Sequence, residues 1–282
     1  MIRLLKLELL KNLNYRPFKI FTGIYFLILI ALLFIGLVDI TLGKDFKFNL
    51  KEQGIYNFPG IWNFTTYIVG ILKIFLGMII IFSITQEFTN RMFKQNTIDG
   101  LSRAEFVGSK MITITLFSMV STIFVFAITL FLGYQYSEST ESSLVTKEMY
   151  FIGCYFLKLF VFFSFLMFLS VLLRKSVFVF LAMFAWWIVE SILGGIESFL
   201  RIKDFKDQAE VIRSADSFYF SKLLPLESMS SIIPNPLFRL KAAEAMGAKY
   251  EFHFPTDSFI ACIVWGVIFI FGTYWILKKR DW

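Results

Sequence analysis

Charged side chains are scarce in this sequence, since Asp, Glu, Lys and Arg make up 17% of its 282 residues, against about a quarter in an ordinary soluble domain. Two cysteines are too few for a disulfide framework, and a single histidine excludes metalloprotease or Ser-His-Asp chemistry. None of the 16 glycines opens a G-x-x-x-x-G-K-[ST] phosphate loop, so the chain has no evident means of holding nucleotide. We therefore predict a protein that is not an enzyme, with no catalytic residues, no metal site and no cofactor of its own.

Apolar residues, in contrast, are abundant and gathered into long blocks. They make up 57% of the chain, and phenylalanine alone occurs 37 times, which excludes a disordered protein. A helix needs about 20 mostly apolar residues to cross the hydrocarbon of a bilayer. Six blocks meet this test, at residues 18–38, 62–85, 111–133, 150–172, 177–199 and 259–277. The sequence therefore predicts an all-α integral membrane protein with six transmembrane helices, forming a single transmembrane domain over residues 1–282.

The basic residues indicate which way the chain crosses the membrane. Six spans leave both termini on one side, where the termini and short loops carry fourteen Lys and Arg residues, against four in the two short loops opposite. By the positive-inside rule, both termini are predicted to be cytoplasmic, in a multi-pass protein of the cell (inner) membrane. The 200–257 loop has balanced charges and is placed on the extracytoplasmic side. The net charge of +7 is thus explained by topology, and we expect no nucleic-acid partner.

The first seventeen residues have the pattern of an amphipathic helix. Ile2, Leu5, Leu9 and Leu13 recur at helical spacing, with basic and polar residues largely elsewhere. Such a helix lies in the headgroup plane with its apolar side in lipid or against other spans. We predict an interfacial elbow helix over residues 1–17, serving at least as a membrane-surface anchor.

The segment 86–110, between the second and third spans, is polar and has clear helix signals. Residues 87–98 are predicted to continue the second span as a polar helix, and Asp99-Gly100 to end it, because glycine adopts the left-handed conformation that a helix end favours. Ser102 and Glu105 have the spacing of a capping box that starts the next helix. The chain would thus leave and re-enter the membrane as a compact, charged hairpin suited to contact a cytoplasmic partner. Any helical hairpin needs a turn and caps, so a purely structural hairpin remains the alternative.

The elbow helix, the six spans, this hairpin and the basic carboxyl end together resemble the membrane subunit of an ABC exporter of the ABC-2 type. In that family the segment that matches 86–110 is the coupling segment, which docks on the ATPase. Many members have a glycine soon after the glutamate, where this chain has Asn90-Arg91. The resemblance implies an ATPase-coupling interface that includes Glu87, Arg91, Asp99, Ser102, Arg103, Glu105 and Lys110.

The same resemblance implies an ABC-2 type permease fold and a set of partners. Two membrane subunits, expected to be identical, would enclose one substrate path, and two ABC ATPase subunits would bind ATP and Mg²⁺ on their cytoplasmic side. The apolar and aromatic composition favours a lipidic, peptidic or otherwise amphiphilic cargo. The lipid bilayer is the remaining partner.

Three charged residues lie within the predicted spans: Lys73, Lys158 and Glu190. An ionisable side chain in the bilayer interior is costly and normally faces protein or water. Lys158 and Glu190 lie at matching depths, about 12 to 14 Å below the outer edge at about 1.5 Å rise per residue. We predict an ion pair between them, with Lys73 as a rival partner. Such a pair would either lock helices together or line a substrate path.

Two other functions remain open from the sequence. The intramembrane charges are compatible with a secondary transporter or channel that has no ATPase, and the 200–257 loop with a membrane enzyme or an assembly scaffold. Cys154 and Cys262 fall a few residues inside the outer ends of their spans, and we expect them to be buried as small apolar side chains rather than joined in a disulfide.

Overall fold

The protein is described from a computed structural model. The structure describes residues 8, 16–37, 39–42, 46–49, 51–202, 219–236 and 254–279, with only the backbone of 39–42, 46–49, 201 and 202. Apart from Glu8, which is helical, and the start of the first long helix, the predicted elbow 1–17 lies outside these residues. His253 and much of the 200–257 loop lie outside them too.

Helices dominate the described chain and follow the apolar blocks of the sequence. The long helices are α2 (Arg16–Leu33), α3 (Gly60–Gly70), α4 (Lys73–Thr89), α6 (Arg103–Tyr136), α8 (Tyr150–Leu173), α9 (Ser176–Ile202) and α13 (Thr256–Lys279). The short ones are η1 (Ile35–Leu37), α5 (Met92–Ile98), α7 (Ser142–Thr146), η3 (Phe220–Leu223) and α11 (Pro225–Ser231). In the described residues, five helical segments are long and apolar enough to span a membrane by themselves, and α3 with α4 makes a sixth if the bent pair counts as one span. The predicted all-α membrane fold is confirmed.

The second span differs from the prediction because it is broken. Between α3 and α4 the axis bends by 43°. At the break, the N–H groups of Ile71 and Leu72 donate to carbonyls three residues back, on Ile68 and Val69 (3.2 and 2.9 Å), which is the tighter hydrogen-bond pattern of a 3₁₀ turn. Gly70 ends α3, and glycine weakens a helix interior. Residues 62–85 are therefore two helices that meet near mid-span.

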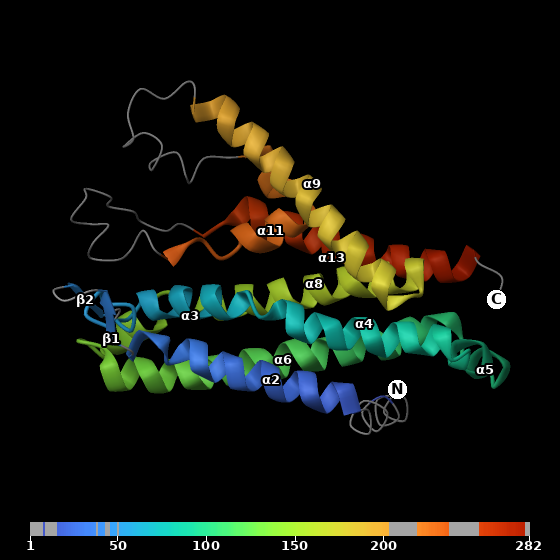
Figure 1. Ribbon diagram of the computed structural model, residues 1–282, viewed down its shortest axis with the longest axis horizontal. Coiled ribbons are helices and arrows are strands. Elements are labelled where there is room, and N and C mark those ends of the chain that lie inside the picture. The colour runs from blue at the N-terminus through green and yellow to red at the C-terminus, as the bar shows by residue number, and fades with distance from the viewer. Residues whose placement is uncertain are drawn as a thin grey trace.

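The helices form a bundle around α8 (Figure 1). This helix contacts α3, α4, α6, α9, α11 and α13, and most of its side chains are buried, as expected for a helix that is apolar on all sides. In contrast, α9 diverges from the bundle toward its carboxyl end (Figure 1), and its large apolar side chains are mostly exposed. Exposure of that kind, on a chain of this composition, indicates a lipid-facing helix.

The two ends of the bundle have different structures. At one, which we call the hairpin end, lie α5 and the carboxyl end of α13; at the other, the opposite end, lie β1 and β2 (Figure 1). There β1 (Asp39–Leu42) and β2 (Phe46–Asn49) pair antiparallel, with Ile40 beside Phe48. This ribbon is the only sheet among the described residues. Close to it, the buried Tyr56 hydroxyl donates to the Leu33 carbonyl (2.8 Å) and accepts from the Gly36 N–H (3.1 Å), and burial raises the pKa of Tyr56 to about 12.

Buried hydroxyl groups join the helices inside the bundle. Tyr25 of α2, Ser121 of α6 and Tyr155 of α8 form a hydrogen-bonded triangle. Within an apolar interior, such groups must satisfy one another, because no water is at hand. Cys154 and Cys262 are buried free thiols, which confirms the prediction for both.

Candidate functional site

The hairpin between α4 and α6 contains two turns with α5 between them. The first is at Asn90 and Arg91, where Arg91 has a φ of 56° and caps the start of α5. That is the left-handed region, which favours glycine. The predicted continuous helix over residues 87–98 is therefore wrong: α4 ends at Thr89, and the chain turns before α5 begins.

The second turn confirms the capping signals read from the sequence. Gly100, two residues after the end of α5, has a φ of 96° and lies in this turn. The Glu105 N–H donates to the Ser102 hydroxyl (3.2 Å), and the Ser102 N–H donates to a Glu105 carboxylate oxygen (2.9 Å). Both halves of the capping box are therefore present, and they fix where α6 begins.

Three phenylalanine rings pack together at the base of the hairpin. Phe93 of α5 is buried, and its ring centroid lies 5.3 Å from that of Phe88 in α4 and 4.8 Å from that of Phe106 in α6. Aromatic pairs at these separations add to the stabilisation from area burial. One side of α5 is thus anchored, and the orientation of α5 is fixed.

The other side of α5 is open to solvent. Among the predicted coupling residues, Arg91, Asp99, Ser102 and Glu105 are exposed. An apolar side chain, Ile98, is 76% exposed beside them. Arg103 is partly buried, and its guanidinium donates to the carbonyl oxygen of Lys278, near the end of α13 (2.5 Å). The hairpin is therefore tied to the last helix of the bundle.

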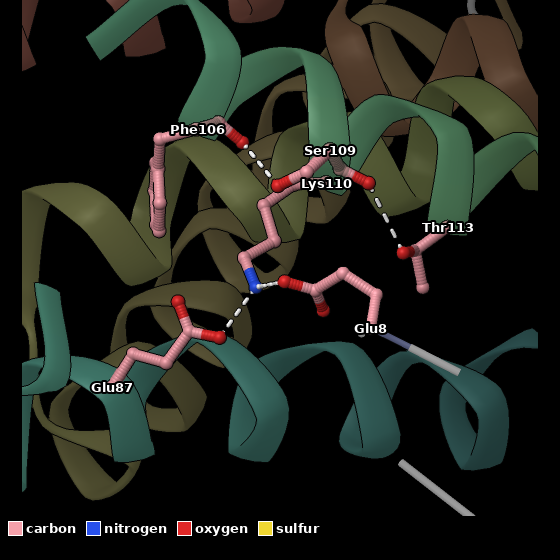
Figure 2. A network of polar contacts seen from close by, with 6 residues as sticks. All are labelled: Glu8, Glu87, Phe106, Ser109, Lys110 and Thr113. Atoms are coloured by element: carbon pink, nitrogen blue, oxygen red, sulfur yellow. Dashed lines mark hydrogen bonds and ion pairs between the residues drawn. The ribbon is translucent and has the colours of Figure 1, made fainter. Parts of the chain in front are cut away.

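Two predicted coupling residues, Glu87 and Lys110, lie inside the protein. The Lys110 ammonium is 2.5 Å from a carboxylate oxygen of Glu87 and 2.6 Å from one of Glu8. Figure 2 shows Lys110 reaching between the two acids, and the Lys110 and Glu87 side chains are only 3% and 5% exposed. Both residues were assigned to the coupling interface, but they are buried and are not part of its exposed surface. With Glu8 they form what we call the buried ion cluster, which joins α4 and α6. Glu8 was missed, although it is the only acidic residue before the first span.

The predicted ion pair between Lys158 and Glu190 is also wrong. Both Glu190 carboxylate oxygens accept other donors, namely the Trp186 indole N–H (2.5 Å) and the backbone N–H groups of Leu226 (3.1 Å) and Glu227 (2.8 Å). Two turns further along α9, Glu197 accepts from the N–H groups of residues 220 and 221, each at 2.8 Å. The two acids of α9 therefore hold the first turns of α11 and η3, where unpaired helix N–H groups favour a carboxylate.

The two intramembrane lysines lie on facing helices. The Lys158 side chain is 5% exposed, and its ammonium packs against Gly70, 3.2 Å from where a Cβ would lie. The Lys73 ammonium lies over the Phe162 ring, 4.6 Å from its centroid. Within the described part of the chain, neither lysine forms an ion pair with a carboxylate. Lys73 is thus no substitute partner for Glu190.

One sequence model of a known family matches almost the whole chain, with the description ABC-2 family transporter protein, over residues 5–282. The chain belongs to the ABC-2 family. A comparison with curated proteins gives no match. Membership makes this ABC-2 protein the membrane subunit of a transporter, not itself catalytic, and implies partnership with an ABC ATPase. It confirms the family resemblance read from the sequence.

Two cavities lie beside α9 in this ABC-2 protein. A polar one of about 740 Å³ is lined by α9, α11 and the start of α13, including Glu190 and Asp257. A smaller, largely apolar one of about 340 Å³ lies between α4, α8, α9 and α11 and is lined by Lys73 and Trp187. Across the ranges that the structure describes, no group of three His, Cys, Asp or Glu side chains could hold a metal ion.

Proposed function

We propose that this chain is the membrane-spanning permease subunit of an ATP-driven exporter, and that the 86–110 hairpin docks a separate ATPase. The single observation that carries the proposal is the construction of α5, which is anchored on one side by Phe93 and exposed on the other. The exposed side presents charged and polar groups around an apolar one, Ile98. Apolar anchors with a polar rim are typical of protein interfaces.

The base of the hairpin supports the transmission of force from such a partner. Coupling between two sites requires an element that holds its shape while it shifts the equilibrium between two arrangements. Here the capping box, the three phenylalanine rings and the buried ion cluster all lie within or directly beneath the hairpin. A displacement of α5 would therefore be passed to α4 and α6 rather than absorbed in the turns.

The positive-inside distribution of Lys and Arg favours a cytoplasmic hairpin end, hence cytoplasmic termini, in the cell (inner) membrane. Two copies of this chain would enclose the substrate path, and two ATPase chains would bind ATP and Mg²⁺. The extracytoplasmic side would then be the opposite end, with β1 and β2.

The test is co-purification with the partner ATPase after changes at exposed apolar residues. Ile98→Asp should abolish recovery of the ATPase, because a charge would replace the apolar centre of the interface. Phe220→Asp is the matched control: its side chain is 67% exposed, but it lies on η3, away from the hairpin, and recovery should be unchanged.

Labelling of an Ile98→Cys variant in intact cells tests the orientation. A membrane-impermeant thiol reagent should leave residue 98 unlabelled until the cells are opened, and labelling from outside would refute docking at the hairpin. Substrate flux driven by an ion gradient, in vesicles without any ATPase, would instead favour a secondary transporter.

A further inference from the structure

Lys73 and Lys158 are two lysines of the bundle interior that form no ion pair with any of the described residues. Neither has a carboxylate oxygen within 4 Å among the described residues. The nearby acids are otherwise engaged: Glu190 accepts from backbone N–H groups, and Glu227 accepts from the Ser231 hydroxyl (3.0 Å). An ammonium group within a membrane span normally faces a partner or a cavity.

The two lysines lie close together around the break in the second span. Lys158 packs on Gly70, and Gly70 is three residues before Lys73. Lys73 in turn lies over the ring of Phe162, one helical turn after Lys158 on α8. The break in the helix thus brings both lysine side chains to one side of α8.

The cavity of about 340 Å³ leads to Lys73 from the lipid side of the bundle. Its wall includes Ile71, Phe184 and Trp187, which are 64%, 50% and 57% exposed. Two of these belong to α9, whose outer surface is apolar and lipid-facing along its length. A ligand that enters here must carry an apolar part along α9 and can place a charged part at Lys73.

We propose that this cavity binds an anionic membrane lipid, whose phosphate group contacts Lys73 with Lys158 as a second positive charge behind it. A lysine ammonium is a common point-charge partner for phosphate, and the Phe162 ring further stabilises the cation. The cavity holds a headgroup and the first methylenes, while the acyl chains lie in the bilayer along α9. The apolar mouth selects a lipid over a small soluble anion.

This inference does not depend on the proposed function, because lipid binding needs no ATPase. It is tested on the purified full-length chain in a neutral detergent, by native mass spectrometry with phosphatidylglycerol and with phosphatidylcholine of the same acyl chains. The wild type should bind phosphatidylglycerol more tightly than phosphatidylcholine. Lys73→Met should weaken phosphatidylglycerol binding about tenfold, as expected for the loss of one charge-assisted hydrogen bond, and leave phosphatidylcholine binding unchanged.

Two control variants distinguish an effect at this cavity from a general effect of charge or folding on lipid binding. Lys73→Arg keeps the charge and should bind like the wild type. Lys175→Met removes an exposed lysine that also lies over a phenylalanine ring, that of Phe178 at 5.9 Å, and should have no effect. Equal phosphatidylglycerol binding by the wild type and Lys73→Met would overturn the proposal, as would displacement of the lipid by inorganic phosphate at equal concentration.

Discussion

Buried lysines at two depths in the bundle differ in whether an acidic side chain lies beside them. Lys110, beneath the hairpin, has two carboxylates within 2.6 Å, one from α4 and one from residue 8. Lys158 and the partly buried Lys73, at the break in the second span, have none among the described residues. Burial of a charged side chain therefore does not by itself reveal its role. Lys110 is paired inside the protein and fixes the structure there, whereas Lys73 and Lys158 form no ion pair within the described part of the chain.

The largest effect is expected at Lys110. Lys110→Met would leave the carboxylates of Glu87 and Glu8 buried without their counter-charge, and removal of one partner of a buried pair costs about 3–5 kcal/mol. The melting temperature of the purified protein in detergent should fall sharply. The double change Lys110→Met with Glu87→Gln should recover part of the loss, and strictly additive losses would contradict the ion cluster.

The next effect concerns Glu190, whose carboxylate accepts hydrogen bonds from α11 instead of pairing with Lys158. Glu190→Ala removes the acceptor of two backbone N–H groups at the start of α11, a loss of about 1.5–3 kcal/mol for charge-assisted hydrogen bonds. Protease cleavage within residues 219–231 should become faster. In a double-mutant cycle, Glu190 and Lys158 should show no coupling beyond about 0.5 kcal/mol, whereas coupling like that between Lys110 and Glu87 would restore the ion pair that the sequence predicted.

A smaller effect is expected at the first turn of the hairpin. Arg91 has a left-handed backbone, which costs a non-glycine residue about 1–3 kcal/mol. Arg91→Gly should therefore raise the stability by about 1 kcal/mol, and Arg91→Val should lower it by a similar amount because β-branched residues disfavour this conformation. The melting temperatures of the two variants should bracket that of the wild type, and the reverse order would contradict the turn geometry.

The smallest effect on stability is expected at Lys73. Because Lys73 has no acidic partner among the described residues, Lys73→Met leaves no carboxylate unpaired and replaces an ammonium with an apolar group of similar length. The stability should change by less than about 1 kcal/mol. If Lys73→Met lowered the stability as much as Lys110→Met in the same melting assay, the difference inferred between the two lysines would be contradicted.

Features set by neighbouring residues could be predicted from the sequence. The apolar blocks predicted the spans, and the spacing of Ser102 and Glu105 predicted the N-terminal cap of α6, because both signals are local. The breaks at Ile71–Leu72 and Asn90–Arg91 were missed, since neither contains proline and only one is next to a glycine.

The errors in the candidate site have one physical cause, which is that the sequence gives depth but not direction around a helix axis. Lys158 and Glu190 lie at similar depths, yet Glu190 turns to the N–H groups of α11. Those groups lie in the first turn of α11, a helix of seven residues that is too short to give a clear periodic signal. The pairing of Lys110 with Glu8 likewise joins residues that are 102 positions apart, which no local pattern predicts.

The hydrogen bond from Arg103 to the Lys278 carbonyl extends the reach of the hairpin beyond its own two helices. Helix α13 has 24 residues, about 36 Å at 1.5 Å per residue, and it contacts η3 and α11 as well as α8. An axial shift of the loop at 100–102 would thus be passed through α13 to η3 and α11.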